Sequence, residues 1–271
     1  MTAKSKPNVT SMLSALTVQD EVATGYLRSK FRHWIDVDKD SCNTRNEVLI
    51  AESTAATKIA SKCSIKSGKW LSKYDNIQVT KAKDLDVDHF VPLNEAWQSG
   101  AYNWDDATRT AFANDLGYAG SLIAVSAKSN RSKGDKDPNR WMPNHKSYRC
   151  EYLANWVAVK YRWSLSVDAS EKKFLVSEVK KCGAKAKVSV PKRVSVVVIA
   201  TSPKESTPPT QTPVPVVPAT PTPVASQSSD NDPRYSSCTA AKGAGYGPYR
   251  RGVDPEYEWY TDRDSDGIVC E

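Results

Sequence analysis

Apolar and polar residues alternate along one short stretch in the middle of the chain, over positions 85–91. Neighbouring side chains of a strand point to opposite faces, so this alternation predicts a β-strand. The residues on its apolar face are Leu85, Val87, His89 and Val91. Pro92 ends the strand, because proline has no N–H to donate to a neighbouring strand. A second apolar run over 122–125 predicts another strand, and a polar loop is expected over 126–137.

Elsewhere, apolar residues recur at intervals of three or four positions, which is typical of an amphipathic helix. This spacing predicts helices over residues 12–34, 94–99, 104–116, 148–163 and 168–182. Asp105 and Asp168 stand where the N-caps of two of these helices would lie. Residues 51–74 show no such period and are interpreted as a short helix or irregular structure. The mixture predicts an α+β fold.

Half of the prolines lie in one stretch near the C-terminal end of the chain. Residues 201–224 contain eight of the sixteen prolines, mixed with threonine, a composition that favours an extended, exposed spacer. We therefore expect three parts. Residues 1–184 form the main domain with a core of about 26–182, residues 185–233 form a basic and then Pro/Thr-rich linker, and residues 234–271 form a small domain.

Charge is distributed unevenly between these parts. Residues 1–200 contain 32 Lys and Arg against 21 Asp and Glu, whereas residues 234–271 contain 5 against 7. A basic surface attracts phosphate backbones independently of base sequence. The main domain therefore suits a polyanion, although a generally soluble basic protein has the same balance.

The six cysteines permit three local pairs: Cys42 with Cys63, Cys150 with Cys182, and Cys238 with Cys270. Six cysteines allow fifteen connectivities, so spacing alone leaves the pairing open. Three disulfides and an extracellular address are favoured over six free thiols. No segment reaches transmembrane length. The N-terminus is basic without an apolar run behind it, so the protein either stays inside the cell or is a mature secreted form.

The chemistry of the first strand and the loop after the second suggests a metal site. A carboxylate at Asp88 and an amide oxygen at Asn130 are hard ligands suited to Mg²⁺. His89 could take a proton from water, because the unperturbed pKa of histidine is about 6.5. The loop cations expected to meet phosphate oxygens are Lys128, Arg131, Lys133 and Lys136. Together they predict metal-assisted hydrolysis of phosphodiesters.

Each of these residues has a structural alternative. A histidine on a strand is more often a hydrogen-bonded structural group than a base, Asp88 could be a turn residue, and Asn130 could cap a helix. His33, within the first expected helix, is interpreted as structural. Residues 36–40 place Asp at alternate positions but lack a turn glycine and a terminal Glu, so a solvated turn is preferred over a cation loop.

The stretch Asp-Val-Asp-His-Phe-Val-Pro, followed later by Ser-Asn-Arg-Ser-Lys-Gly-Asp, resembles the HNH (ββα-metal) nucleases. The whole segment 26–182 is similar to a secreted HNH family related to the C-terminal domain of the GmrSD restriction enzymes. The resemblance implies a ββα-metal core with surrounding helices, Mg²⁺ or Mn²⁺ held by Asp88 and Asn130, and His89 as general base. It also implies products with a 5′-phosphate and a 3′-hydroxyl.

One position departs from the HNH pattern. These domains commonly carry an asparagine just before the second strand, which orients the catalytic imidazole, and Ser121 stands there in this chain. Asn114 is the nearest side-chain amide. Ser121 and Asn114 are therefore both candidates for the residue that orients His89.

The small C-terminal domain ends in an acidic turn. Asp262, Asp264 and Asp266 alternate, Gly267 follows, and the carbonyl of Ile268 and the carboxylate of Glu271 complete a possible Ca²⁺ ligand set. The Glu comes too early for an EF-hand. The segment resembles the Excalibur family of short extracellular calcium-binding domains, and a plain acidic turn is the alternative.

The sequence as a whole predicts a secreted or cell-surface, monomeric, metal-dependent HNH endonuclease. Its expected substrate is nucleic acid, DNA with little sequence specificity, and its small domain would bind Ca²⁺ and could associate with the cell envelope. The alternative is a non-catalytic surface protein that holds nucleic acid or a wall polymer in a calcium-dependent way.

Overall fold

The computed structural model describes residues 8–199, 234–243, 248–251, 254–261 and 268–270. Two compact units are present, one up to Ala200 and one from Thr201 onward, and each is described by itself. Within the described residues, no helix is long and apolar enough to cross a membrane.

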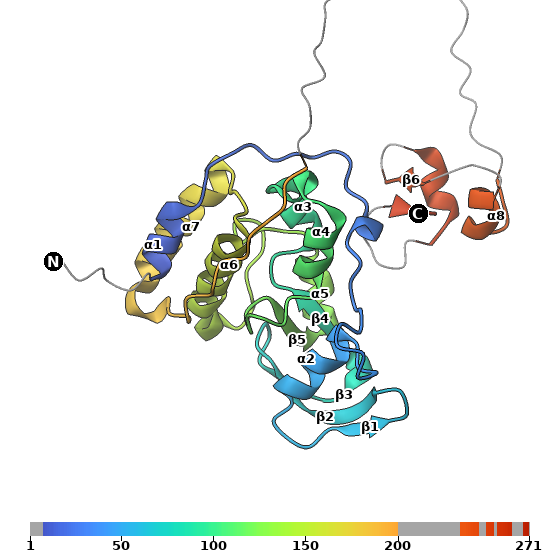
Figure 1. Cartoon of the computed structure of the whole chain (residues 1–271), viewed down its shortest axis with the longest axis horizontal. Helices are drawn as coiled ribbons and strands as arrows, with labels where there is room; N and C mark the ends of the chain where they lie inside the picture. Colours follow the sequence, from blue (N-terminus) through green and yellow to red (C-terminus); the bar gives the residue numbers. More distant parts are fainter. Residues whose placement is uncertain (1–7, 200–233, 244–247, 252–253, 262–267, 271) are drawn as a thin grey trace, which may run out of the picture. The chain divides into compact units, whose positions relative to one another are not determined.

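The first unit is built around two antiparallel strands, β4 (Leu85–His89) and β5 (Leu122–Ser126), which lie at its centre in Figure 1. Leu85 pairs with Ser126 and His89 pairs with Leu122, so the two predicted strands form one ladder. Helix α5 (Ala127–Lys133) follows β5 directly. The hydroxyl of Ser126 caps it by accepting the N–H of Ser129 at 3.2 Å.

Helix α5 replaces the first half of the loop that the sequence predicted over 126–137. The strand pair and the helix after it give a strand–strand–helix unit, and the insertion between the strands holds α3 (Leu93–Gln98) and α4 (Asp106–Ala113). Both helices of the insertion were predicted, and Asp105 caps α4 by accepting the N–H of Thr108.

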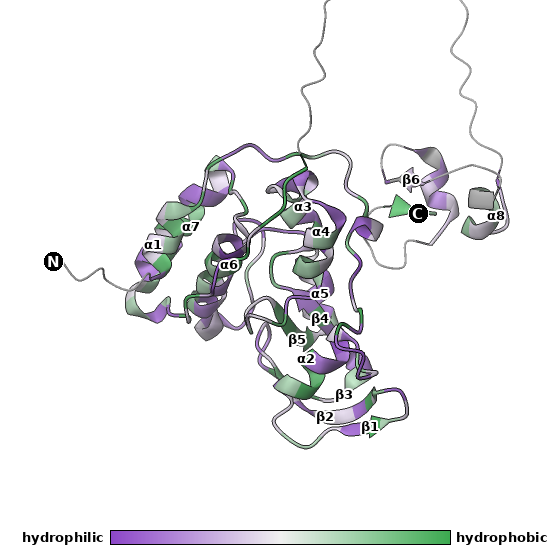
Figure 2. Cartoon of the chain, viewed as in Figure 1, coloured by the Kyte–Doolittle hydropathy of each residue, from purple (hydrophilic) through white to green (hydrophobic). Residues whose placement is uncertain are grey.

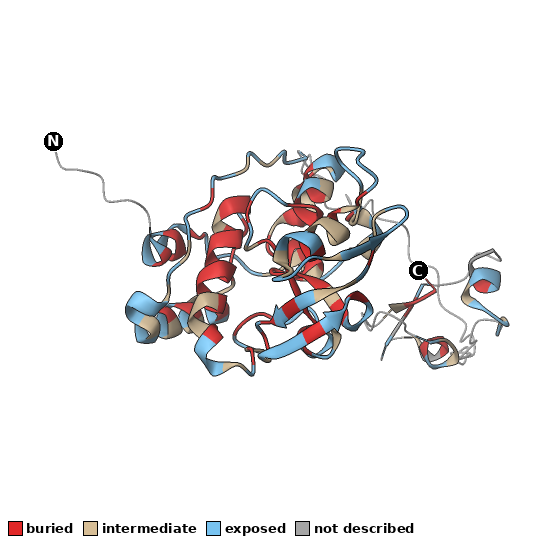
Figure 3. Ribbon diagram, turned by 90° about the horizontal axis from the view of Figure 1, so that it is seen from below, coloured by how far each residue is buried: buried red, intermediate tan, exposed pale blue. Residues whose placement is uncertain are grey.

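The two faces of the β4–β5 pair contribute to two different apolar cores. Leu85, Val87, Leu122 and Ala124 belong to a smaller cluster with α2 (Thr44–Glu52). Ile123 and Val125 belong to a larger cluster around α6 (Arg149–Trp163). Strand β5 is coloured as hydrophobic in Figure 2, and the middle of α6 is buried, as the helix drawn mostly in red in Figure 3 shows. The strand pair is therefore held rigidly from both sides.

The predicted helices 148–163 and 168–182 are confirmed as α6 and α7 (Ala169–Cys182), with Asp168 as the N-cap of α7. The helix predicted over 12–34 is wrong. Helix α1 (Val9–Ala15) is short, and the chain then runs irregularly apart from a 3-10 turn at Arg28–Lys30.

Residues 51–74, interpreted from the sequence as a short helix or irregular structure, instead contribute two strands to a three-stranded antiparallel sheet. Its order is β1 (Lys58–Ala60), β2 (Ser64–Ser72) and β3 (Ile77–Lys81), with bulges in both pairings. Four further 3-10 helices lie at Ala82–Asp84, Ala101–Asn103, Lys146–Tyr148 and Gly183–Lys185.

All three predicted disulfides are formed, Cys42–Cys63, Cys150–Cys182 and Cys238–Cys270. The first links the turn before α2 to the turn between β1 and β2. The second links the start of α6 to the end of α7, and the third closes the C-terminal unit. Such bridges stabilise mainly by restricting the unfolded chain, and they suit an extracellular protein.

The segment 185–199, which the sequence placed in the linker, packs against the first unit. The N–H of Asp105 donates to the carbonyl of Val197 at 3.1 Å, and the N–H of Ile199 donates to Asn103 at 2.7 Å. Val194 and Val196 pack on the larger apolar cluster. The compact unit therefore extends past α7 to about residue 200.

The described part of the second unit contains α8 (Cys238–Gly243), β6 (Tyr249–Arg250), a 3-10 helix at Pro255–Trp259 and β7 (Ile268–Val269). Strands β6 and β7 pair antiparallel, and Tyr249 stacks on Tyr260 with ring centroids 5.8 Å apart. Among the candidate Ca²⁺ ligands only Ile268 is described. Those outside the described residues are Asp262, Asp264, Asp266 and Glu271.

Candidate functional site

Strand β4 carries two carboxylates on the face opposite to Leu85 and Val87, because Asp86 and Asp88 are two residues apart. Asp88 is buried. Its Oδ2 accepts hydrogen bonds from Lys133 Nζ at 2.7 Å and from the Tyr74 hydroxyl at 2.6 Å. Burial raises the pKa of Asp88, and the Lys133 ammonium and the Tyr74 hydroxyl oppose that shift. The ammonium thus favours the ionised carboxylate.

Asp86 lies closer to the predicted metal ligand on α5. The side-chain amide nitrogen of Asn130 donates to Asp86 Oδ2 at 3.2 Å, and Arg131 Nε is 3.7 Å from the same oxygen. The Asp86 side chain is 29% exposed, so it is the more accessible of the two carboxylates. Because the amide nitrogen of Asn130 is used by Asp86, its amide oxygen is left to accept or to ligate.

His89 ends β4 and points away from the two carboxylates, following the strand alternation. Its Nε2 is 2.9 Å from the carbonyl oxygen of Ala113, and its ring stacks on Trp34 with centroids 5.0 Å apart. A carbonyl oxygen only accepts, so Nε2 carries the hydrogen and Nδ1 is the basic nitrogen of the neutral ring. Burial lowers the pKa of His89 to about 3, which keeps the imidazole neutral near pH 7.

The two residues considered for orienting His89 bond elsewhere. The Ser121 hydroxyl donates to Asp115 at 2.6 Å. The amide nitrogen of Asn114 donates to the carbonyls of Arg32 and Thr110, and its oxygen accepts the N–H of Ile35 at 3.1 Å. Asn114 therefore ties the segment that carries Trp34 to the end of α4. The imidazole is instead contacted by the carbonyl of Ala113, the Trp34 ring and, edge-on at 6.2 Å between centroids, the His33 ring.

Known protein families match two parts of the chain. A family model described as the C-terminal domain of GmrSD restriction endonucleases matches residues 35–178, more than half of the chain. The chain belongs to this family. The Excalibur calcium-binding domain matches residues 235–271. The predicted resemblances to the GmrSD C-terminal domain and to the Excalibur family are confirmed.

A relative from Arthroderma benhamiae, described as an uncharacterized secreted protein, is 43% identical over 173 residues. The match covers 64% of this chain and 83% of the relative. No solved structure matches the chain. The secreted relative and the disulfides of this GmrSD C-terminal domain protein confirm the predicted extracellular location.

The basic residues of α5 and the loop after it divide into two groups in this GmrSD C-terminal domain. Lys128, Arg131 and Lys136 are exposed, where a polyanion could reach them. Lys133 is fully buried, and besides Asp88 it bonds the carbonyl of His89 at 3.0 Å. Its ammonium therefore does not lie on the surface that the sequence analysis assigned to phosphate.

Three residues that contribute to this site were not predicted from the sequence. Asp86 could have been found, because it shares the strand face of Asp88 by the period of two. Tyr74 and Trp34 carry no such signal, since they lie 14 and 55 positions before their partners Asp88 and His89 and reach them only through the fold.

Proposed function

We propose that this protein is a secreted, metal-dependent endonuclease of the HNH type that hydrolyses DNA with little sequence specificity. One observation carries the proposal. On the strand–strand–helix unit, Asp86 and Asp88 share one face of β4 with Asn130 in hydrogen-bond contact, and the next residue of the strand, His89, is a neutral histidine whose basic nitrogen is defined by the Ala113 carbonyl. Membership in a restriction endonuclease domain family supports a nuclease.

The donor set fits a hard divalent cation. Asp86, Asp88 and Asn130 offer carboxylate and amide oxygens, which Mg²⁺ and Mn²⁺ prefer, and Asp86 is open to solvent. Such an ion would supply Lewis-acid stabilisation of charge on the phosphate and on the leaving 3′ oxygen. The chain's own residues do the rest.

His89 acts as the general base through Nδ1, taking a proton from the attacking water. The Ala113 carbonyl fixes the tautomer, and Trp34 limits the rotation of the ring. Lys133 favours the ionised form of Asp88 and ties α5 to β4. The exposed Lys128, together with other surface cations, positions the phosphate backbone. The products would carry a 5′-phosphate and a 3′-hydroxyl.

The C-terminal Excalibur domain is proposed to bind Ca²⁺ through the alternating carboxylates Asp262, Asp264 and Asp266, the Ile268 carbonyl and Glu271. Support comes from the family match and from the spacing of these residues in the sequence. A role in attachment to the cell envelope is consistent with a secreted protein.

Two observations favour a second candidate function. Asp88 is already neutralised by a buried ammonium, and His89 is a weak base in the free protein. Both features would also suit a nucleic-acid-binding protein that does no chemistry. Measurement of cleavage separates the two functions.

Plasmid nicking by the full chain is the test, with Mg²⁺, with Mn²⁺ and with chelator. We expect His89→Ala to lower the nicking rate by roughly 100-fold or more, as loss of a general base does. His145→Ala is the matched control. That imidazole is half-buried and contacts Lys73 and Ser147, so its removal should leave most activity. Normal nicking by a folded His89→Ala protein, or equal activity in chelator, would refute the proposal.

A further inference from the structure

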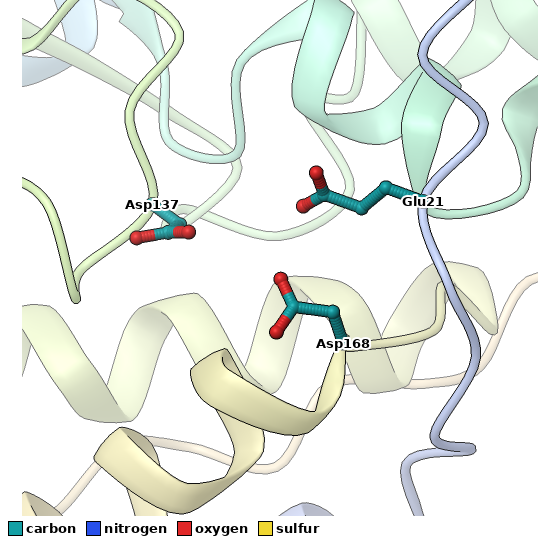
Figure 4. Close-up of side chains that lie close together, drawn as sticks. All are labelled: Glu21, Asp137 and Asp168. Atoms are coloured by element: carbon teal, nitrogen blue, oxygen red, sulfur yellow. The ribbon is translucent and has the colours of Figure 1, made fainter.

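Three carboxylates from distant parts of the sequence converge in the first unit, and none of them is a proposed nuclease ligand. Glu21 comes from the irregular segment after α1, Asp137 from the loop after α5, and Asp168 from the N-cap of α7. One oxygen of each lies within 4.8 Å of the others. Figure 4 shows the three side chains turned toward a shared space.

The backbone around each carboxylate is fixed by hydrogen bonds. On either side of Glu21, the N–H of Gln19 donates to Val167 at 2.9 Å and that of Val22 donates to Gln98 at 3.1 Å. The carboxylate of Asp168 accepts the N–H of Glu171 at 2.9 Å as the helix cap. The three groups are therefore held together by the fold and not by contacts with one another.

Asp137 supplies a second, independent observation. Its side chain is only 1% exposed, and one oxygen accepts the N–H of Arg140 at 3.0 Å. The other oxygen, Oδ2, is buried and has no hydrogen-bond partner among the described residues. The nearest cation, Arg140 Nε, is 3.7 Å from it on a side chain that is 60% exposed. Because this ion pair is long and its guanidinium lies mostly in solvent, the buried oxygen still lacks a hydrogen bond, which is costly, so something should compensate for it.

The surrounding charge points to a cation as that compensation. Burial and the nearby Glu95 raise the pKa of Asp137, and burial, Glu95 and Asp168 raise the pKa of Glu21. The buried ammonium of Lys160 is shared between Glu95 at 2.6 Å and Glu171 at 2.7 Å. The Lys160 ammonium is therefore already paired with two other carboxylates. The group formed by Glu21, Asp137 and Asp168 carries excess negative charge.

We infer that Glu21, Asp137 and Asp168 form a Ca²⁺ site within the first unit, distinct from the proposed nuclease ligands and from the Excalibur domain. Their oxygens, all within 4.8 Å of one another, are close enough to share one ion. Ca²⁺ accepts irregular sets of carboxylate and water oxygens, whereas Mg²⁺ demands near-octahedral geometry and loses its waters reluctantly, so three carboxylates held by separate backbone segments suit Ca²⁺. Waters would complete the coordination. The ion would fasten the segment after α1 to α7 and to the loop after α5.

The exposed acidic group Asp36, Asp38 and Asp40 provides a matched contrast. Its oxygens also lie within 4.8 Å of one another, but all three residues are exposed. Asp36 accepts the N–H of Ser41 and Asp40 accepts that of Cys42. None of these three residues has a buried oxygen without a partner, so this group needs no ion and serves as the control.

Calorimetric titration of the full chain with Ca²⁺, together with its Ca²⁺-dependent rise in Tm, tests the site. We expect Asp137→Asn and Glu21→Gln each to lower the affinity of one bound ion by about 10-fold or more, since affinity follows the number of charged ligands. Each should also lose most of the rise in Tm seen for the first unit. Asp36→Asn, with the same charge change, should keep both.

Glu21→Gln makes the test decisive even if Asp137→Asn does not fold, because Glu21 is only half-buried in an irregular segment. Equal Ca²⁺ stoichiometry and equal rises in Tm for the wild type, Glu21→Gln and Asp36→Asn would overturn the inference. So would a first unit that Mg²⁺ stabilises at the same concentration as fully as Ca²⁺. Neither readout depends on nuclease activity.

Discussion

Replacing Lys133 by methionine would test whether this residue stabilises the fold or binds phosphate. Lys133 is predicted from the sequence to be one of the cations that meet phosphate. In the structure it is completely buried, with its Nζ 2.7 Å from Asp88 Oδ2. If the structure is right, Lys133→Met weakens the fold. If the phosphate role is right, it weakens binding to nucleic acid and leaves the fold intact.

The magnitude follows from the burial of the pair. Two unit charges 2.7 Å apart attract by about 6 kcal/mol at an effective dielectric constant of about 20. Burial opposes this attraction, since it is the largest cause acting on both partners, raising the pKa of Asp88 and lowering that of Lys133. Removing one partner leaves the other charge buried alone, which costs about 3–5 kcal/mol. That is a large part of the roughly 5–15 kcal/mol that stabilises a typical domain.

Urea unfolding followed by tryptophan fluorescence would measure this loss. Lys128→Met and Lys136→Met are the controls, and both should stay within about 0.5 kcal/mol of the wild type because their side chains are exposed. Asp88→Asn combined with Lys133→Met should recover part of the stability, since it leaves no unpaired charge. A Lys133→Met protein that is less than about 1 kcal/mol destabilised would refute the reasoning from burial.

Three further outcomes are expected. Burial raises the pKa of Glu52 to about 7, although the hydrogen bond from the N–H of Ala124 acts in the opposite direction. The carboxyl holds its proton more tightly in the folded protein than in the unfolded chain, so the wild type should lose stability as the pH rises from about 4.5 through 7. Glu52→Gln should be more stable than the wild type at pH 8 by up to about 3 kcal/mol in urea unfolding, and an unchanged pH profile would contradict this. Limited proteolysis should cut the Pro/Thr-rich stretch 201–224 and release a core that still nicks plasmid, and an inactive core would show that the small domain completes the site. Asp264→Ala should abolish one Ca²⁺ site with a Kd of roughly 10⁻⁴–10⁻³ M in calorimetry, and equal binding would reduce that stretch to an acidic turn.

Much of the central architecture was readable from residue patterns. The alternation over 85–91 and the run over 122–125 gave the paired strands, and the three- and four-residue spacing over 148–163 gave α6. These elements bury apolar side chains on regular faces, so their periods appear in the sequence. The local cysteine spacing likewise matched the three bridges, although composition alone could not select them.

The failures have physical causes. Helix α5 buries Ser129 and Lys133, which are polar, so it shows no apolar period. In the expected first helix, Phe31 packs in the larger cluster and Trp34 packs against the smaller one, so their three-residue spacing reflects an irregular chain that passes between two cores. Strand β2 is largely polar and interrupted by bulges, which hides its period of two.

The packing of residues 185–199 also governs how the first unit could be joined to other modules in evolution. The chain leaves the domain beside Asn103, near α3, and not at the end of α7 (Figure 1). A gene fusion joined at residue 184 would remove the main-chain partners of Asn103 and Asp105 and uncover the apolar residues beneath Val194. Joined after Ile199, a new module would leave all of these contacts in place. A domain that can be transferred between proteins therefore ends about seventeen residues after α7, at the point where its apolar surface is covered.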